Sequence, residues 1–286
     1  MLRVAVPNKG SLSEPASRML REAGYRQRTV ARELVLHDPD NDTEFFFLRP
    51  RDIATSVGSG QLDVGITGRD LLLDSGSDAR EVMPLGFGAS TFRFAARPGT
   101  ADTIADLEGL RVASSYPRLV QAYLADHGIE VSVTRLDGAV ETAIRLGVAD
   151  VVADVVETGS TLRQAGLEVF GEPILQSEAV LIRGSGNGSA DADVETALDQ
   201  LQRRLNGVMV AATYVIVDYD VPSTLVEQAC AITPGIESPT ISPLHDPAWV
   251  AVRALVPRPQ TNKVRDELYE LGARGILVTD IHACRL

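Results

Sequence analysis

The sequence predicts an α/β protein with two α/β lobes around a cleft, followed by a smaller ferredoxin-like βαββαβ domain. Strand and helix patterns alternate through the first 176 residues, which favours mostly parallel sheets with helices on both faces. A Gly-x-x-Asp pattern occurs twice, at Gly60-Gln61-Leu62-Asp63 and at Gly147-Val148-Ala149-Asp150, and each copy leads through a buried strand to a Thr-Gly pair. This repeat indicates two similar lobes, with coincidence among common turn residues as the alternative. Open α/β sheets bind ligands at the carboxyl ends of their strands, where both pairs lie.

The elements of the predicted lobes follow from runs of β-branched and aromatic residues and from apolar residues at helical spacing. In the first third we expect strands at 2–6, 33–37, 44–48 and 63–67 and helices at 13–23, 51–58 and 69–74. Ser13 is a plausible N-cap of the first helix. Further along we expect strands near 111–113, 130–134, 150–156 and 167–170 and helices near 117–127, 139–146 and 160–165.

The end of the chain has a different order of elements. Residues 184–192 are rich in Gly, Ser, Asn and Asp, and this composition predicts a flexible surface loop. After a helix at 193–205, we expect strands at 208–217, 236–241, 248–256 and 274–281 and helices at 222–231 and 261–271. This βαββαβ order is the split unit of a ferredoxin-like domain.

The charge of the chain is uneven and excludes several classes of partner. The 286 residues carry 27 basic and 39 acidic side chains, which gives a net charge of −12. Residues 1–60 are close to neutral, and only two of the basic residues are lysines, Lys9 and Lys263. A surface this acidic argues against binding to nucleic acid or to a membrane surface. Positive charge is therefore gathered locally, in the first segment.

Several features predict a cytoplasmic protein. Cys230 and Cys284 are too few for a disulfide scaffold, and neither has a Cys or His partner at metal-ligand spacing. The sequence begins with the strand-like residues 2–6 and not with the basic-then-apolar pattern of a signal peptide. No apolar stretch approaches the roughly 18 residues that a membrane-spanning helix needs.

The strongest local signal lies at 150–162, where an apolar strand ends in carboxylates and then in hydroxyl residues at a helix start. Thr158-Gly159-Ser160-Thr161 offers hydroxyls and backbone N–H groups, and the helix dipole favours a phosphate there. Asp154 and Glu157 would repel a phosphate, so they suit sugar hydroxyls or Mg²⁺ instead. A plain N-cap with solvated hydroxyls is the alternative. The combination with carboxylates favours a phosphosugar site.

Basic side chains gather at strand ends of the first lobe. Lys9 lies in the turn directly after the first strand, and lysine supplies a compact point charge that suits phosphate. Arg49 and Arg51 follow the third predicted strand, and Arg69 follows the fourth. These side chains could converge on a polyanion. For any single one of them, a solvated surface position is the alternative.

Four motifs stand together in the order and spacing of a known family. They are Pro-Asn-Lys-Gly-Ser-Leu at 7–12, Leu-Arg-Pro-Arg-Asp-Ile at 48–53, Gly-Ile-Thr-Gly-Arg-Asp at 65–70 and Asp-Val-Val-Glu-Thr-Gly-Ser-Thr-Leu at 154–162. In these motifs, and over essentially its whole length, the chain resembles the long form of ATP phosphoribosyltransferase, the first enzyme of histidine biosynthesis. The resemblance implies two lobes like those of periplasmic binding proteins and a C-terminal ACT-like domain. It divides the chain into three parts. Catalytic lobe I, on the ATP side, comprises 1–90 with 178–208, and catalytic lobe II, on the phosphoribosyl pyrophosphate side, comprises 91–177. The regulatory domain comprises 209–286.

The resemblance implies a Mg²⁺-dependent transfer in which N1 of the adenine of ATP attacks C1 of phosphoribosyl pyrophosphate and releases pyrophosphate. It gives the catalytic roles to Lys9, Arg49 and Asp154. Phosphoribosyl pyrophosphate would contact Glu141, Asp154, Thr158, Gly159, Ser160 and Thr161, and ATP would contact Lys9, Gly10, Ser11, Arg49, Arg69, Asp70 and Tyr116. The Mg²⁺ would be held mainly by substrate phosphates, so no metal ligand is assigned. Tyr116 would stack near the purine, with half-buried packing as the alternative.

The resemblance also implies feedback inhibition by L-histidine and assembly into homo-oligomers, as dimers or hexamers. Asp218, at the end of the strand expected at 208–217, would pair with the ammonium group of histidine, and Ser238, Thr240 and Ala273 lie in segments that match the effector pocket. Two other functions stay open, a two-lobed small-solute-binding protein without turnover and a non-enzymatic amino-acid sensor. The basic residues of the first lobe count against the solute-binding protein, and the intact phosphosugar motif counts against the sensor.

Overall fold

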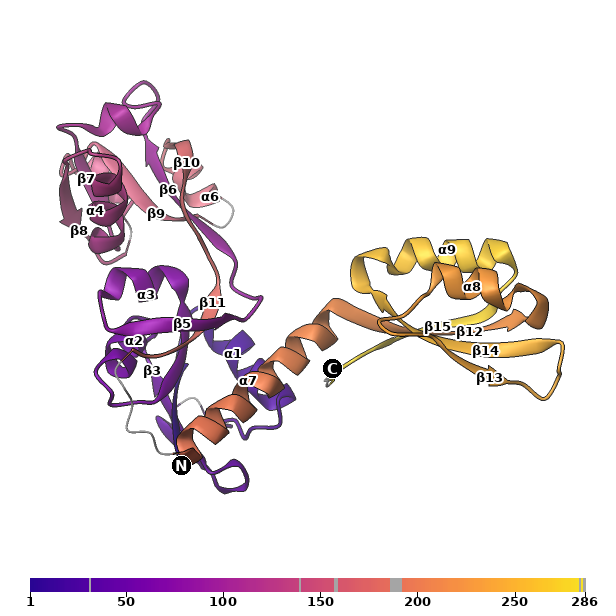
Figure 1. The fold of residues 1–286 in the computed structure, drawn as a ribbon. Coiled ribbons are helices and arrows are strands. Elements are labelled where there is room, and N and C mark those ends of the chain that lie inside the picture. Colours follow the sequence, from indigo (N-terminus) through magenta and orange to yellow (C-terminus); the bar gives the residue numbers. More distant parts are fainter. Residues whose placement is uncertain (31, 139, 157–158, 186–191, 283, 285–286) are drawn as a thin grey trace. The chain divides into compact units, whose positions relative to one another are not determined.

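The computed structural model describes residues 1–286 except 31, 139, 157–158, 186–191, 283 and 285–286 (Figure 1). The chain forms two compact units. The first contains Met1–Arg21 and Tyr25–Gln200, and the second contains Glu22–Gly24 and Leu201–Leu286. The first unit holds two sheets and the second holds one, and apolar core clusters pack against each sheet.

One half of the first unit, which we call lobe I, is built on a six-stranded sheet in the order β2-β3-β1-β4-β11-β5. Its strands are β1 (Leu2–Pro7), β2 (Val35–Asp38), β3 (Thr43–Leu48), β4 (Val64–Gly68), β5 (Ala79–Pro84) and β11 (Ala179–Gly184). Its helices are α1 (Ser13–Glu22), the 3-10 turn Pro39–Asn41, α2 (Pro50–Gly58) and α3 (Arg69–Ser75). β1 pairs in parallel with β3 and β4, while the other pairings are antiparallel. The carboxyl ends of β1, β3 and β4 therefore meet at one edge.

The other half, lobe II, is built on a five-stranded sheet in the order β10-β6-β9-β7-β8. Its strands are β6 (Ser90–Ala96), β7 (Arg111–Ser114), β8 (Ser132–Arg135), β9 (Val151–Val156) and β10 (Glu168–Ser177). Its helices are the 3-10 turn Ile104–Leu107, α4 (Pro117–Asp126), α5 (Thr142–Arg145) and α6 (Ser160–Gln164). β7 is parallel to β8 and β9, whereas β6 is antiparallel to β9 and β10.

The central strands of both lobes are apolar on both faces because helices and neighbouring segments cover both sides of each sheet. Val4 and Ala5 of β1 are fully buried although they point to opposite faces, and the same holds for Val151 and Val152 of β9. Such strands appear in the sequence as short continuous apolar runs. Their burial fixes the register of each sheet, and with it the residues that leave the strand ends.

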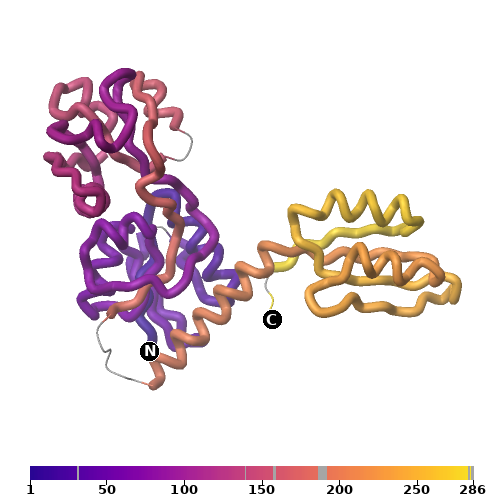
Figure 2. Tube along the Cα trace, turned by 45° about the horizontal axis from the view of Figure 1, so that its top comes forward, coloured from indigo at the N-terminus to yellow at the C-terminus, as the bar shows by residue number. Residues whose placement is uncertain are grey.

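The chain crosses between the lobes twice, between β5 and β6 and again between β10 and β11 (Figures 1 and 2). Ser90 and Ser177 lie opposite each other where the two crossing segments pair. Glu178 ties these segments together, because its carboxylate accepts a hydrogen bond of 3.1 Å from the N–H of Gly86. The prediction of two α/β lobes is confirmed.

The second unit contains the βαββαβ domain. Its elements are β12 (Tyr214–Pro222), the 3-10 turn Ser223–Leu225, α8 (Val226–Ile232), β13 (Thr240–Pro243), β14 (Trp249–Pro257), the 3-10 turn Arg258–Gln260, α9 (Thr261–Leu271) and β15 (Arg274–Asp280). The sheet order β13-β14-β12-β15, antiparallel throughout, is the ferredoxin-like order. Both helices lie on the same face of the sheet (Figure 1), where Val217, Tyr219 and Leu268 form the core. The predicted fold of this domain is confirmed.

Several predicted elements differ from the structure. The strand expected at 208–217 begins only at Tyr214, because α7 (Ala192–Thr213) continues as one helix through the preceding residues (Figure 2). Leu201, Leu205, Val208 and Ala211 are all buried at helical spacing, so packing outweighs the strand preference of the valine-rich segment. β5, β6 and β11 are strands that the sequence reasoning missed. The helix expected at 139–146 spans only four residues, as α5.

Candidate active site

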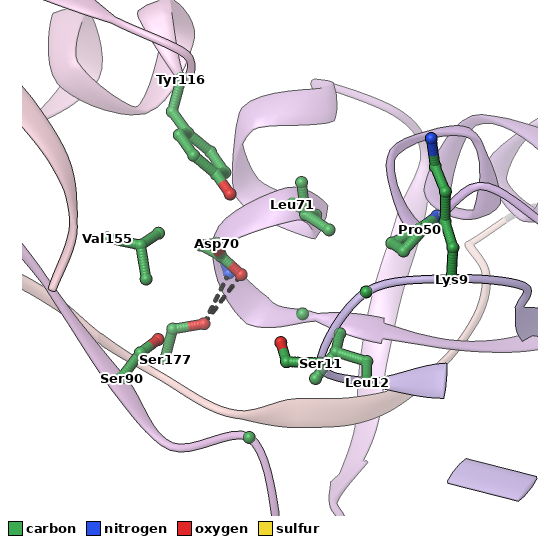
Figure 3. Close-up of a pocket in the computed structure, with 13 residues that line it drawn as sticks. Lys9, Ser11, Leu12, Pro50, Asp70, Leu71, Ser90, Tyr116, Val155 and Ser177 are labelled. Atoms are coloured by element: carbon green, nitrogen blue, oxygen red, sulfur yellow. Dashed lines mark hydrogen bonds between the residues drawn. The ribbon is translucent and has the colours of Figure 1, made fainter. Parts of the chain in front are cut away.

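A cavity of about 180 Å³ lies between the two lobes of the first unit (Figure 3). Lys9, Gly10, Ser11 and Leu12 follow β1 and line its lobe I side, together with Asp70 at the start of α3. Tyr116 and Val155 line the cavity from lobe II, and Ser90 and Ser177 line it from the crossing segments. Predicted site residues from distant parts of the sequence therefore surround one space.

A hydrogen-bond network is buried against this cavity. The Ser177 hydroxyl donates to Oδ1 of Asp70 at 2.9 Å and accepts the backbone N–H of Asp70 at 3.1 Å. In Figure 3 the Tyr116 hydroxyl points toward the same carboxylate. Burial raises the pKa of Tyr116, and the negative charge of Asp70 raises it further. Tyr116 is therefore a neutral phenol that can donate a hydrogen bond.

The ring of Tyr116 is already in contact on two sides. Phe92 packs edge-on against it, with 5.1 Å between the ring centroids. The Arg51 guanidinium carbon lies 4.9 Å from the ring centroid, in a cation–π contact. A purine that stacks on Tyr116 must therefore share the ring with Arg51 or displace it. The stacking role stays a prediction, while the half-buried packing is observed.

Asp154 lies in β9, next to Val155 of the cavity wall. Burial raises the pKa of Asp154, and the negative charges of Glu141 and Asp70 raise it further. Two interactions lower the pKa of Asp154. The Val155 N–H donates to Oδ1 of Asp154 at 2.8 Å, and the positive charge of Arg51 acts in the same direction. Glu141 is the residue before α5. Glu141 and Asp70 are thus the acidic neighbours whose charges act on Asp154.

Lys9 and Arg49 are among the basic residues that make no ion pair with any described residue. Both side chains are exposed, and neither makes a salt bridge or side-chain hydrogen bond within the described part of the chain. Gly10 follows Lys9 with φ of 80°, a left-handed conformation that favours glycine. Arg49 is the residue before α2, and the proline at the first helical position fixes where this helix begins.

Arg69 lies in a different environment from the one that its predicted role suggests. Its guanidinium makes two 2.8 Å hydrogen bonds to the carboxylate of Glu81 and a third of 3.3 Å to Glu178. The hydrogen bonds to Glu81 are the main cause of its raised pKa. Arg69 does not line the cavity of Figure 3. A contact with ATP would require it to exchange a carboxylate for a phosphate, and this role stays a prediction.

The expected phosphate loop is described only in part, because Thr158 lies outside the described residues. Gly159 adopts φ of 68°, which a residue with a Cβ rarely adopts. Ser160 and Thr161 are exposed and form the first turn of α6. Backbone N–H groups in the first turn of a helix have no partner within the helix. Their role toward a phosphate stays a prediction.

Asp74 is a buried carboxylate that the sequence reasoning missed. Its Oδ1 accepts the backbone N–H groups of Arg118 and Leu119 at 3.0 and 3.3 Å, and its Oδ2 pairs with Arg51 at 3.1 Å. Arg118 also donates to the backbone carbonyl of Ser75 at 3.0 Å. Asp74 therefore joins α3 of lobe I to the first turn of α4 in lobe II. A local signal exists, since an aspartate in the last turn of a helix is unfavourable without an outside partner.

The predicted effector residues lie in the second unit. Asp218 is in the middle of β12 and not at a strand end, because the strand continues to Pro222, past its expected end at 217. Asp218 and Thr240 both lie opposite Arg253 of β14, and Asp218 accepts a 2.7 Å hydrogen bond from it. Ser238 precedes β13 and is exposed, whereas Ala273 is buried just before β15. The role of these residues in binding an effector stays a prediction.

The described residues hold neither a cluster of metal-binding side chains nor a helix that could cross a membrane. No group of three or more His, Cys, Asp or Glu side chains there could hold a metal ion. None of the helices in that part of the chain combines the length and the apolar character that crossing a membrane requires.

Comparisons with known proteins agree over the whole chain. A family model described as ATP phosphoribosyltransferase matches residues 49–207, and one described as the C-terminal domain of HisG matches residues 211–283. An ATP phosphoribosyltransferase from Arthrobacter sp. (strain FB24) is 64% identical over 286 residues, and one from Streptomyces avermitilis is 63% identical, with 100% of both chains covered in each case. The solved structure of the ATP phosphoribosyl transferase (HisG:HisZ) complex from Thermotoga maritima is 25% identical with a TM-score of 0.60. This match covers 72% of the present chain and 99% of that chain.

Proposed function

The chain belongs to the ATP phosphoribosyltransferase family, and we propose that the cavity between its lobes is where ATP reacts with phosphoribosyl pyrophosphate. The enzyme catalyses the first step of histidine biosynthesis. In the proposed reaction, N1 of adenine forms a bond to C1 of the ribose, and the C1–oxygen bond to pyrophosphate breaks. The products are N1-(5-phosphoribosyl)-ATP and pyrophosphate.

The observation that carries the proposal is that Lys9 and the end of β9 line the same cavity from opposite lobes. We assign Lys9 and Arg49, which have no ion pair in the described residues, to the phosphates of ATP and to the departing pyrophosphate. A charge without a partner can neutralise an incoming phosphate without first giving up another contact. Gly10 and Ser11 would approach ATP through the same turn. Arg69 would join them only after it releases Glu81.

On the lobe II side we assign Asp154 and Glu141 to the ribose hydroxyls, and Thr158 with Gly159, Ser160 and Thr161 to the 5-phosphate. A ribose that loses pyrophosphate develops positive charge at C1, so nearby carboxylates stabilise the transition state more than the ground state. The raised pKa of Asp154 shows that burial and like charges disfavour its anion before a ligand arrives. N1 of adenine has no proton to lose, so the reaction needs no general base. Positioning and charge neutralisation carry the catalysis.

Asp70 and Tyr116 lie between the two proposed substrate sides. The Ser177 hydroxyl holds the Asp70 carboxylate in place, so Asp70 can accept a hydrogen bond from an adenine amino group or a ribose hydroxyl. The Tyr116 hydroxyl stays protonated because its pKa is raised. We therefore assign both residues to orienting ATP, with Tyr116 as a hydrogen-bond donor or a stacking surface.

The available donors fit a Mg²⁺ ion that is bound mainly by substrate. Asp154 and Glu141 offer the hard carboxylate oxygens that Mg²⁺ prefers. The described residues contain no cluster that could hold a metal by side chains alone, so the substrate phosphates would supply most of its ligands. When bound, the ion would neutralise negative charge on the departing pyrophosphate.

Regulation is assigned to the βαββαβ domain, which the match to the HisG C-terminal domain covers. We propose that L-histidine binds there, with its ammonium group on Asp218 in competition with Arg253, and with Ser238, Thr240 and Ala273 nearby. We further propose that the protein works as a homo-oligomer, as dimers or hexamers whose balance histidine shifts. Such coupling needs an equilibrium that both ligands bias.

The test is pyrophosphate release by purified protein. Release should require ATP, phosphoribosyl pyrophosphate and Mg²⁺ together, and Lys9→Ala and Thr161→Ala should each lower it at least about a hundredfold, as expected when a group that stabilises transition-state charge is lost. Lys263→Ala is the matched control, because the second lysine lies exposed on α9 of the other unit. Absence of release from folded wild-type protein that still binds a small solute would favour a solute-binding protein. Full activity of both variants would refute the assigned roles.

A further inference from the structure

A second hollow of about 520 Å³ adjoins the cavity of Figure 3 and shares Lys9, Pro50 and Leu71 with it. Lys9, Arg49 and Arg51 line it from lobe I, and Arg135 lines it from lobe II. We call it the basic pocket. Among the described residues that line it, four are basic and two, Asp52 and Asp137, are acidic, in a chain whose net charge is −12. The local excess of positive charge is thus opposite to that of the whole molecule.

The backbone of lobe II fixes the position of Arg135. This residue ends β8 in register with Ser114 of β7. The N–H of the next residue, Leu136, donates to the Ser114 carbonyl at 3.0 Å, and its carbonyl accepts the hydroxyl of Ser115 at 2.6 Å. The Ser115 hydroxyl also accepts the N–H of Gly138 at 3.4 Å. The turn that carries Arg135 is therefore tied to the residues just before α4.

The side chain of Arg135 is only loosely paired. Its Nε lies 3.3 Å from Oδ1 of Asp137, and the two side chains are 53% and 66% exposed. An ion pair this exposed contributes about 0–1 kcal/mol. The two NH₂ groups of its guanidinium make no hydrogen bond or ion pair with any described residue. They form the fork that binds phosphate oxygens in pairs.

Charges of the same sign thus face each other across the two lobes. Lys9 and Arg49 on one side have no ion pair in the described residues, and Arg135 on the other side has a weak one. Like charges that line one pocket repel each other unless an anion lies between them. A chain of phosphates carries several negative charges, so it can neutralise basic side chains on both walls of the pocket. A single phosphate or a carboxylate would leave part of the positive charge unpaired.

We infer that Arg135 is a further binding residue, on lobe II, for a linear polyphosphate held in the basic pocket. The inference rests on the proposed function, which supplies two sources of this chemistry, the triphosphate of ATP and the pyrophosphate that leaves. Arg51 contributes charge but is already paired with Asp74, so Lys9, Arg49 and Arg135 are the residues available for the ligand.

The experiment measures binding to full-length protein by isothermal titration calorimetry, with ATP, AMP, pyrophosphate and tripolyphosphate as separate ligands. Arg135→Gln should weaken binding of tripolyphosphate and of ATP or pyrophosphate by about tenfold, the effect of one charge-assisted contact. AMP has no polyphosphate chain, so its affinity should change less than about twofold by the same reasoning. Arg97→Gln is the matched control, because Arg97 is an exposed arginine of lobe II outside the pocket.

Each outcome decides a separate point. A loss for ATP assigns the pocket to the triphosphate, and a loss for pyrophosphate alone assigns it to the leaving group. Unchanged affinity for all three polyphosphates, relative to Arg97→Gln, overturns the inference even if the wild type turns over. Binding of tripolyphosphate that depends on Arg135, in wild-type protein that releases no pyrophosphate from its substrates, would sink the proposed function and leave the inference standing.

Discussion

Replacing Asp74 by alanine should loosen the joint between the two lobes of the first unit. The carboxylate is 8% exposed as a residue and belongs to α3 of lobe I. It accepts the backbone N–H groups of Arg118 and Leu119 in the first turn of α4, and it pairs with Arg51. An alanine supplies none of these interactions. The variant would therefore leave two backbone donors and one guanidinium without their partner.

The size of the effect follows from these contacts. Loss of a side chain that caps the start of a helix costs about 1–2 kcal/mol. Removing the partner of Arg51, whose side chain is 35% exposed, adds about 1 kcal/mol. At about 2–4 °C of melting temperature per kcal/mol for a protein of this size, the variant should melt about 5–10 °C below the wild type. Asp74→Asn keeps an oxygen that can accept N–H groups, so it should lose less.

Activity should fall as well, because Asp74 holds Arg51 of the basic pocket and the helix that follows Tyr116 of the proposed ATP side. Arg51 is its ion-pair partner, and Tyr116 directly precedes the helix that it holds. A small displacement of groups that orient a substrate costs a large factor in rate, so kcat/KM for ATP should fall by about tenfold or more. Thermal melting monitored by circular dichroism and steady-state kinetics measure the two effects.

The matched control is Asp126→Ala, which removes an exposed aspartate at the other end of the same helix. A negative charge at the end of a helix is unfavourable toward its dipole, so this variant should be as stable as the wild type or slightly more so. If Asp74→Ala melted within about 1 °C of that control, the carboxylate would not be joining the lobes. If both variants kept the wild-type kcat/KM for ATP, Asp74 would have no positioning role.

Much of the site could be predicted because it depends on strand ends. A parallel strand buried on both faces appears in the sequence as a short apolar run, and the residues that follow it must lie at one edge of the sheet. This reasoning found Lys9 after β1 and Asp154 in β9, and both prove to lie at or beside one cavity. The order of elements near the end of the chain was enough to identify the βαββαβ domain.

What could not be predicted depends on contacts between distant residues. The strand-end argument treats Arg69 like Arg49, yet Glu81 and Glu178 pair with Arg69 and no described residue pairs with Arg49. The informative cations are those that both line the space between the lobes and have no ion pair with a described residue, and the sequence does not distinguish them. The backbone partners of Asp74 lie 44 and 45 residues away and Arg51 lies 23 residues away, and no local periodicity links them.

The C-terminal end of α7 shows a second reason why a prediction from sequence fails. Residues 208–217 contain several valines and an isoleucine, which by composition favour a strand. The first part of this segment instead extends α7 by burying Val208 and Ala211 in line with Leu201 and Leu205. Tertiary packing therefore decides where the helix ends. At its other end β12 continues to Pro222, past the expected end at 217, so Asp218 lies in the middle of the strand, beside Arg253.

Two further predictions concern single carboxylates. Asp218→Asn should abolish inhibition by L-histidine without loss of activity. The control, Asp266→Asn on the exposed face of α9, should leave inhibition unchanged. Retained inhibition in Asp218→Asn would place the effector elsewhere. The second prediction concerns the dependence of stability on pH. It follows from the pKa of Asp154, which burial and neighbouring negative charges raise. Between the ordinary pKa of an aspartate and this raised value, the folded protein binds more protons than the unfolded chain, so wild-type stability falls as pH rises through that window. Asp154→Asn removes this cost and should melt above the wild type at neutral pH, with the difference vanishing in acid below the ordinary carboxyl pKa. Asp150→Asn should instead melt below the wild type at neutral pH, because hydrogen bonds from Arg111 lower the pKa of Asp150 to about 2. That stabilisation is present above the ordinary pKa and is lost as pH falls toward 2. Thermal melts of the wild type, Asp154→Asn and Asp150→Asn from neutral pH into acid measure both effects. If both variants changed stability with the same sign, the opposite directions of the two pKa shifts would be refuted.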